Sequence, residues 1–268
     1  MCENNYDINF NKIINSLKAI DEVDAVALGG SRATGANDPK SDYDIYVYCS
    51  GDVTIEQKTN AIAPFCSETE IGNHYWELED NCVMKNGVAI DIIYRKVDMF
   101  EEYLNTVIDK SFAFNGYTTC FWHNIITCKV LFDKSGKFTE LANKYNIPYP
   151  EQLRANIIEK NRKLLSGVLP SYDEQIKKAE SRGDLVSVHH RTTEFLASYF
   201  DIIFAYNRVP HPGEKRLISL CKEKCETLPQ NFEENITALL NAVATGGAYE
   251  IVCEMVSKLD DMLNKNKI

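Results

Sequence analysis

Apolar residues recur at three- and four-residue intervals near the start of the chain, which predicts a helix with one buried face over residues 8–20. A short apolar run at residues 23–28 is typical of a buried strand. A second strand is predicted at residues 42–49, which are rich in Tyr, Ile and Val. The Asn-Asp-Pro sequence at residues 37–39 marks the loop between the two strands. Residues 53–65 then read as the next helix.

A hairpin is predicted further along, with strands at residues 75–84 and 88–94. Asn86-Gly87 separates them, and this residue pair is the one that a tight type I′ turn demands. Asp91 then lies in the second strand of the hairpin. Residues 99–130 read as helical with a break near Asn115-Gly116, and residues 129–132 are the last predicted strand.

The second half of the chain shows no strand pattern. A connector containing two prolines spans residues 145–150, and proline disfavours both helix interiors and central strands. Helices are predicted at residues 151–167, 172–182, 184–206, 213–227 and 231–264. The sequence therefore predicts an α+β protein, in which a sheet-containing domain of residues 1–135 is followed by an all-helical domain of residues 146–268.

Charge is distributed unevenly over the 268 residues, whose net charge is −10. Residues 1–133 contain 10 Lys and Arg against 21 Asp and Glu, a net charge of −11, whereas residues 134–268 carry +1. Proteins that bind long nucleic acids neutralise phosphates with Lys and Arg, so the acidic half disfavours such a partner. A small cationic molecule fits this field better.

The cysteines and the apolar runs give the expected compartment. Nine scattered cysteines lack the paired spacing of a zinc site, so we expect reduced thiols; Cys221 and Cys225 lie one helical turn apart, but no second ligand pair follows them. The first ten residues are polar, and no apolar run approaches the roughly 20 residues that span a bilayer. We expect a cytoplasmic protein with no membrane partner.

Candidate chemistry gathers around the first two strands. Gly29-Gly30-Ser31-Arg32 follows the first strand, and such a turn lets backbone N–H groups and a hydroxyl approach phosphate oxygens. Taken alone, the glycines are more typical of an ordinary turn between a strand and a helix. Asp42 and Asp44, however, are two residues apart on the next strand and therefore project from the same face, where two carboxylates suit magnesium. Asp91, in a later strand, is the preferred candidate for a third acid beside these two. Its rivals Glu77, Glu79 and Asp80 lie on the preceding strand or near the turn.

These residues resemble the nucleotidyltransferase superfamily that includes DNA polymerase beta, whose signature is Gly-Ser followed by Asp-x-Asp. The resemblance covers residues 20–133. It implies that Asp42, Asp44 and Asp91 bind two Mg²⁺ ions, that Asp91 acts as general base, and that the glycine turn with Arg32 binds the nucleotide. The pattern is similar to that of the small-molecule members, such as aminoglycoside and lincosamide nucleotidyltransferases, which carry a helical C-terminal domain.

In the helical half, the resemblance implies that Lys215 reaches the phosphates of the nucleotide, although a solvated lysine in an exposed turn explains it equally well. His190 and Glu194 on the predicted helix 184–206 are candidate acceptor-binding residues, with a structural role for the histidine as the alternative. Trp76 and Trp122 could stack on a ring of a ligand, but aromatic side chains more commonly pack in a core. Thr34 stands where many relatives have a second arginine.

The function predicted from the sequence is transfer of AMP from ATP to a hydroxyl of a small molecule, an aminoglycoside-like or lincosamide-like antibiotic in the first instance, with resistance as the consequence. An alternative is a protein-modifying, AMP-adding enzyme of the toxin-antitoxin type. Another alternative is a catalytically silent binding protein of the same fold. The sequence names neither the acceptor nor the nucleobase, and it leaves open whether two chains pair as a homodimer.

Overall fold

The chain divides into two compact units in its structure, which is a computed structural model. The structure describes residues 6–35, 37–38 and 41–265, so Cys2 and Pro39 lie outside the described residues. The first unit comprises residues 1–105 and 124–147, and the second comprises residues 106–123 and 148–268. Within the described ranges, no helix combines the length and the apolar character needed to cross a bilayer.

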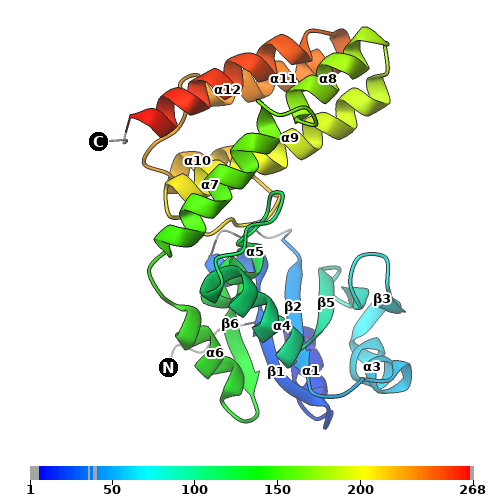
Figure 1. Cartoon of the computed structure of the whole chain (residues 1–268). Coiled ribbons are helices and arrows are strands. Elements are labelled where there is room, and N and C mark those ends of the chain that lie inside the picture. Colours follow the sequence, from blue (N-terminus) through cyan, green and yellow to red (C-terminus); the bar gives the residue numbers. More distant parts are fainter. Residues whose placement is uncertain (1–5, 36, 39–40, 266–268) are drawn as a thin grey trace. The chain divides into compact units, whose positions relative to one another are not determined.

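The first unit contains a six-stranded mixed sheet with the strand order β3-β4-β5-β2-β1-β6 (Figure 1). Strands β2 and β5 are parallel, and the other neighbouring pairs are antiparallel. The strands are β1 (Val23–Leu28), β2 (Tyr43–Cys49), β3 (Cys66–Asn73), β4 (Glu79–Met84), β5 (Ala89–Lys96) and β6 (Lys129–Asp133). Five of them were predicted. Strand β3 was missed because residues 67–70 are polar and exposed in succession, so no alternation marks it.

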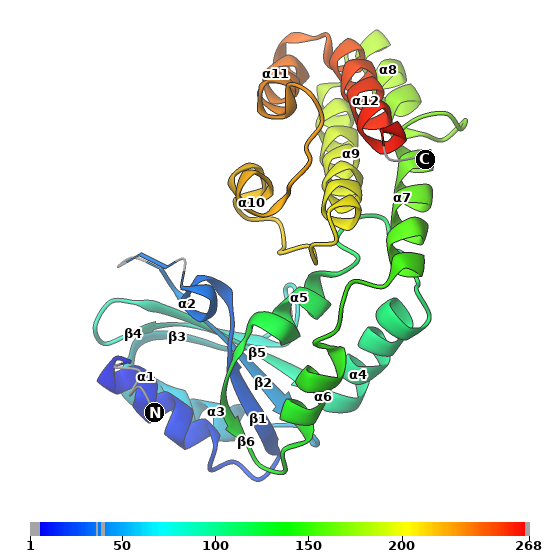
Figure 2. The same ribbon diagram turned by 90° about the vertical axis from the view of Figure 1, so that its left-hand side faces the viewer.

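Helices cover both faces of this sheet (Figure 2). The first unit contains α1 (Ile8–Leu17), α2 (Gly30–Thr34), α3 (Ile55–Ile62), the 3₁₀ turn Ala63–Phe65, α4 (Val97–Leu104) and α6 (Lys137–Tyr145). Helix α5 (Cys120–Thr127) has residues in both units. The apolar faces of α1 and α3 form a core with one face of the sheet. On the other face, the Tyr48 ring packs against Phe100 of α4 and Phe138 of α6. Asp44 lies on this second face as well. Asp44, Tyr46 and Tyr48 are two residues apart from one another along β2, and side chains at this spacing point to the same side of a sheet.

The turn between β4 and β5 differs from the predicted type I′ turn. Gly87 has a positive φ of +83°, but Asn86 does not, whereas a type I′ turn needs a positive φ at both central residues. The amide of Met84 donates to the carbonyl of Val88 at 2.9 Å, so the loop has three residues instead of two. This length sets the register, in which Asn81 pairs with Asp91.

Six helices build most of the second unit, and α9 runs through its core. They are α7 (Glu151–Leu165), α8 (Tyr172–Ser181), α9 (Leu185–Tyr206), α10 (Leu217–Lys224), α11 (Phe232–Thr245) and α12 (Ala248–Asn264). The single helix predicted for residues 231–264 is wrong. Gly246 and Gly247 have φ values of +94° and +90°, which an α-helix does not accommodate, and they separate α11 from α12.

Residues 106–123 pack with the second unit, although they precede the predicted domain border at residue 135. The amide and hydroxyl of Thr118 donate to the buried carboxylate of Asp201 at 3.2 and 2.7 Å. Asn161 donates to the same carboxylate at 3.3 Å and accepts from the amide of Gly116 at 3.0 Å. Burial raises the pKa of Asp201 to about 7. This hydrogen-bonded group ties residues 116–118 to α7 and α9.

Candidate active site

Three aspartates meet on the face of the sheet that carries Tyr46. The parallel pairing of β2 with β5 places Asp44 directly beside Asp91, and Asp42 precedes Asp44 by two residues. One carboxylate oxygen of each aspartate lies within 4.8 Å of the others. All three side chains are half-buried, so they remain open to a ligand. The structure thus brings together the three acids that the sequence indicated.

The glycine turn after β1 lies against this carboxylate group. The amide of Gly29 donates to the carbonyl of Asp44 at 2.8 Å. Gly30 has a φ of +60°, and a Cβ at this position would collide with Oδ2 of Asp44. Only glycine lets the main chain come this close to the carboxylate. Ser31 follows at once in α2, so its hydroxyl-bearing side chain starts from the same turn.

Arg32 has partners inside the first unit. Its guanidinium donates to the carbonyls of Ser41 and Asp42 at 2.5 and 2.9 Å, and it stacks over the Tyr43 ring at 4.0 Å. The sequence suggested a nucleotide contact for this residue. In the structure its guanidinium holds the chain that leads into β2, and it thereby helps to fix the backbone position of Asp42.

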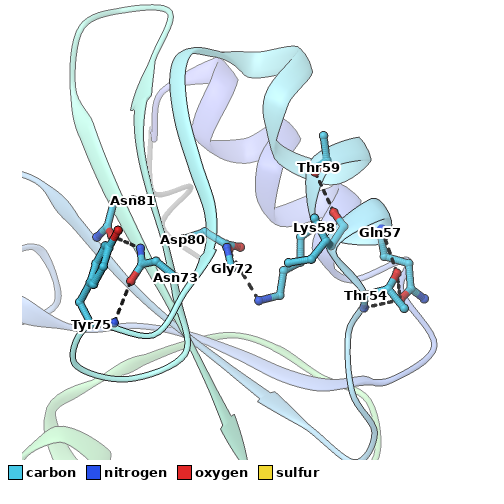
Figure 3. A network of polar contacts seen from close by, with 10 residues as sticks. Thr54, Gln57, Lys58, Thr59, Gly72, Asn73, Tyr75, Asp80 and Asn81 are labelled. Atoms are coloured by element: carbon cyan, nitrogen blue, oxygen red, sulfur yellow. Dashed lines mark hydrogen bonds and ion pairs between the residues drawn. The ribbon is translucent and has the colours of Figure 1, made fainter.

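The other acids considered for the third position, Glu77, Glu79 and Asp80, have different surroundings from Asp91. Asp80 points to the opposite face, where its carboxylate accepts from the amide of Gly72 at 2.6 Å and lies 3.6 Å from the ammonium of Lys58 (Figure 3). Glu77 binds the guanidinium of Arg95 through two hydrogen bonds of 2.9 and 2.8 Å. Glu79 is buried, and this burial, followed by the charge of Asp91, raises the pKa of its carboxyl.

Asn81 is a site residue that the sequence reading missed. Its side-chain amide donates to Oδ1 of Asp91 at 2.8 Å, and its oxygen accepts from Nδ2 of Asn73 at 2.6 Å. A two-residue turn at Asn86-Gly87 would have paired Cys82 with Asp91 instead. Two signals together could have found Asn81. Glu79 and Asn81 are two residues apart and so share one face of β4, and a loop of three residues places Asn81 opposite Asp91.

The site residues suggested for the helical half belong to the second unit. Lys215 lies in an exposed turn that precedes α10, and His190 is exposed on α9. Glu194 is half-buried on α9, and it raises the pKa of Tyr172 after the larger effect of burial. The tryptophans differ in burial, because Trp122 is 1% exposed and Trp76 is 87% exposed. Core packing therefore explains Trp122 and leaves Trp76 unexplained.

Comparison with protein families agrees with this geometry. Residues 11–102 match the family described as polymerase beta, nucleotidyltransferase. The first unit is a nucleotidyltransferase domain. Residues 119–217 match a domain of unknown function (DUF4037). A search of curated protein sequences finds no match for this chain.

Several solved structures show a distant similarity to this chain. A nucleotidyltransferase-like protein from Exiguobacterium sibiricum has 11% sequence identity and a TM-score of 0.43, covering 96% of this chain and 74% of that one. An aminoglycoside 6-adenyltransferase from Bacillus subtilis has 10% identity and a TM-score of 0.29, with coverages of 95% and 90%. A spectinomycin adenyltransferase from Enterococcus faecialis with ATP and spectinomycin has 13% identity and a TM-score of 0.33, covering 93% of this chain and 99% of that one.

The nucleotidyltransferase domain offers a donor set that suits a divalent metal ion. Carboxylate oxygens are the hard ligands that Mg²⁺ prefers, and Mg²⁺ is usually held by one or two carboxylates together with substrate phosphates. Asp42, Asp44 and Asp91 supply such oxygens within 4.8 Å of one another. The fit of these residues to a hard cation is therefore good, and the main chain of the glycine turn lies directly against one of them, Asp44.

Proposed function

We propose that this nucleotidyltransferase transfers a nucleoside monophosphate, with ATP as the first donor to test, to a hydroxyl of a small molecule. The single observation that carries the proposal is the convergence of Asp42, Asp44 and Asp91 beside the Gly29–Gly30 turn. The family match gives the reaction type, and the strongly acidic first half of the chain favours a small cationic acceptor over a nucleic acid.

In the proposed reaction, the acceptor oxygen forms a bond to the α-phosphorus of the nucleotide. The bond from that phosphorus to the oxygen bridging the β-phosphate breaks, and pyrophosphate leaves with the electron pair. Asp91 receives the proton of the acceptor hydroxyl as general base. Asp42, Asp44 and Asp91 would hold Mg²⁺, which supplies stabilisation of the charge that develops on the phosphate oxygens. Ser31 and the backbone of the glycine turn orient the β- and γ-phosphates.

A protein acceptor is the second candidate for the same chemistry, since the three carboxylates serve either acceptor. The two candidates differ in what becomes labelled. We would incubate the full chain with each α-labelled nucleoside triphosphate, Mg²⁺ and a panel of antibiotics and polyols, and we would follow label transfer and pyrophosphate release. We expect label on a small molecule together with stoichiometric pyrophosphate. Label on a co-purified protein and on no small molecule would support the second candidate and reject the first.

A catalytically silent protein would bind nucleotide without releasing pyrophosphate under any of these conditions. Retention of all three acids in one cluster supports the active alternative. Lys215, His190 and Glu194 are proposed, from the resemblance and from their residue types, as contacts to the nucleotide and to the acceptor.

A further inference from the structure

The loop between β3 and β4 is held in place and nevertheless presents two large aromatic side chains to solvent. The Tyr75 side chain is 72% exposed and Trp76 is 87% exposed. Oδ1 of Asn73 accepts from the amide of Tyr75 at 3.5 Å, and Nδ2 of the same residue donates to Asn81 (Figure 3). At the other end of the loop, Glu77 binds Arg95 of β5. These contacts connect an exposed aromatic pair to the strands that carry the catalytic acids.

One row of cross-strand neighbours runs from the glycine turn to this loop. Gly29 bonds to Asp44, Asp44 pairs with Asp91, Asp91 pairs with Asn81, and Asn81 pairs with Glu70 of β3. Paired residues of neighbouring strands point to the same face, so these side chains share the catalytic face. Adjacent strands lie about 4.8 Å apart, which puts Glu70 roughly 10 Å from Asp91. A hydrogen bond from the Tyr75 phenol to Glu70 raises the pKa of that phenol.

In-line displacement gives this row a direction. In phosphoryl transfer, the attacking and leaving oxygens lie on opposite sides of the phosphorus. The leaving pyrophosphate belongs with the glycine turn, at the β1 end of the row. The acceptor hydroxyl must therefore approach from the Asp91 side, where the row continues through Asn81 to Glu70 and the aromatic loop.

We propose that Tyr75, Trp76 and Glu70 form an acceptor subsite on the first unit, and that its occupant is a small polyol carrying a protonated amine. This inference rests on the proposed function and names the acceptor class for the same site. Each exposed ring offers a π face that attracts a cation, and the exposed Glu70 carboxylate offers a counter-charge. Glu77 does not compete for the amine, since Arg95 already neutralises it.

Tryptophan fluorescence tests this proposal directly, because Trp76 and Trp122 are the two tryptophans of the chain. Acrylamide in solution reaches the exposed Trp76 ring, while Trp122 is buried. We would titrate the full chain, with ATP and Mg²⁺ present, with kanamycin, spectinomycin and lincomycin as cationic probes. N-acetylated kanamycin and sucrose are the matched probes that keep hydroxyls without the positive charge. We expect at least one cationic probe to protect Trp76 from quenching and the neutral probes to give no protection.

Variants then separate the subsite from the catalytic acids. We expect Trp76→Ala, Tyr75→Ala and Glu70→Gln each to raise the KM for a transferred cationic probe by about tenfold, with kcat changed less than twofold, because they remove ground-state binding. Ile8→Ala and Glu56→Gln are the controls, since both residues are exposed on α1 and α3, which cover the opposite face of the sheet. The controls should leave KM unchanged.

Two results would overturn the subsite. One is transfer to a cationic probe with the same KM in all three variants as in the wild-type chain. The other is a lack of protection of Trp76 by every cationic probe. Failure of the proposed function has a different signature, namely absence of label transfer from the wild-type chain to any small molecule, and it is read from the label and not from the fluorescence.

Discussion

The side-chain amide of Asn81 donates a 2.8 Å hydrogen bond to the carboxylate of Asp91 on the neighbouring strand. Asn81 is itself fixed by Asn73, which donates to its oxygen. The amide therefore cannot flip without losing both bonds. One oxygen of Asp91 is thus oriented by Asn81, and the half-buried carboxylate lies on the face that it shares with Asp44.

Replacing Asn81 should damage the site more than the fold. We expect Asn81→Leu to lower the transfer rate by about 10- to 100-fold, the usual cost of losing a partner that orients a metal ligand. Calorimetric titration with Mn²⁺ should show weaker binding by a similar factor. Asn60→Leu, at an exposed position of α3, is the matched control. An Asn81→Leu variant with the Mn²⁺ affinity of the wild type would contradict an orienting role.

Asp44→Asn tests the metal assignment itself. The substitution keeps the size of the side chain and removes its charge, so the folded domain should survive with an unchanged or slightly higher melting temperature. We expect magnesium-dependent transfer to fall by about 1,000-fold, because the ion contributes several kcal/mol to charge stabilisation. Asp52→Asn, which removes an exposed carboxylate paired with Lys96, should have full activity. Near wild-type turnover in Asp44→Asn would refute the assignment.

Gly30 and Gly35 form a matched pair for testing the glycine turn. Both have positive φ values, +60° and +78°, so alanine at either position costs about 1–2 kcal/mol in backbone strain. A Cβ at Gly30 meets the Asp44 carboxylate, whereas a Cβ at Gly35 meets no atom of the described residues within 4 Å. We expect both variants to lose stability in urea unfolding, Gly30→Ala by more because the Asp44 carboxylate must move, and only Gly30→Ala to lose metal binding and transfer. Equal activities of the two variants would show that the close approach is not needed.

Much of this could be predicted from the sequence because the relevant signals are local. Alternation along residues 42–49 places Asp42 and Asp44 on one face, and the glycine turn follows directly from the end of a buried strand. The third acid, Asp91, could be placed on a strand once the hairpin around Asn86-Gly87 was recognised. The match of residues 11–102 to a nucleotidyltransferase family agrees with that interpretation.

What the sequence missed depends on the exact length of a loop and on an edge strand without an apolar pattern. The loop at residues 85–87 is one residue longer than the predicted turn, and this single residue decides that Asn81 lies beside Asp91. Strand β3 has only exposed polar residues at 67–70, so Glu70 could not be assigned to the face that carries Asp44 and Asp91. The contact between Thr118 and Asp201 joins residues 83 positions apart, a separation that no local pattern reveals.

Stability should depend on pH through Asp201. Burial raises the pKa of this carboxyl to about 7 in the folded chain, from an ordinary value of 3.8. Between these two values the folded state holds a proton that the unfolded state releases, so the free energy of unfolding falls as pH rises, by at most about 1.4 kcal/mol per pH unit. Asp201→Asn lacks this titration. The wild type should therefore lose stability relative to Asp201→Asn from pH 4 to 7, and the difference should level off above pH 8.

The buried histidines do not obscure this comparison. Burial lowers the pKa of His211 to about 3 and that of His123 to about 4, so both destabilise the fold in acid. They are present in both chains, and their contribution cancels when the two urea denaturation series are subtracted. A difference that is constant from pH 4 to 8 would show that Asp201 keeps an ordinary pKa.

Strand β3 ends the sheet on one side, and its two exposed glutamates on one face, Glu68 and Glu70, have a consequence for assembly. A second copy of the chain that added its own β3 to this border would bring Glu68 and Glu70 of both copies together, and like charges on paired strands repel. The border is thereby protected against continuous sheets and fibre growth. The open side of β3 is therefore disfavoured as a surface for self-association.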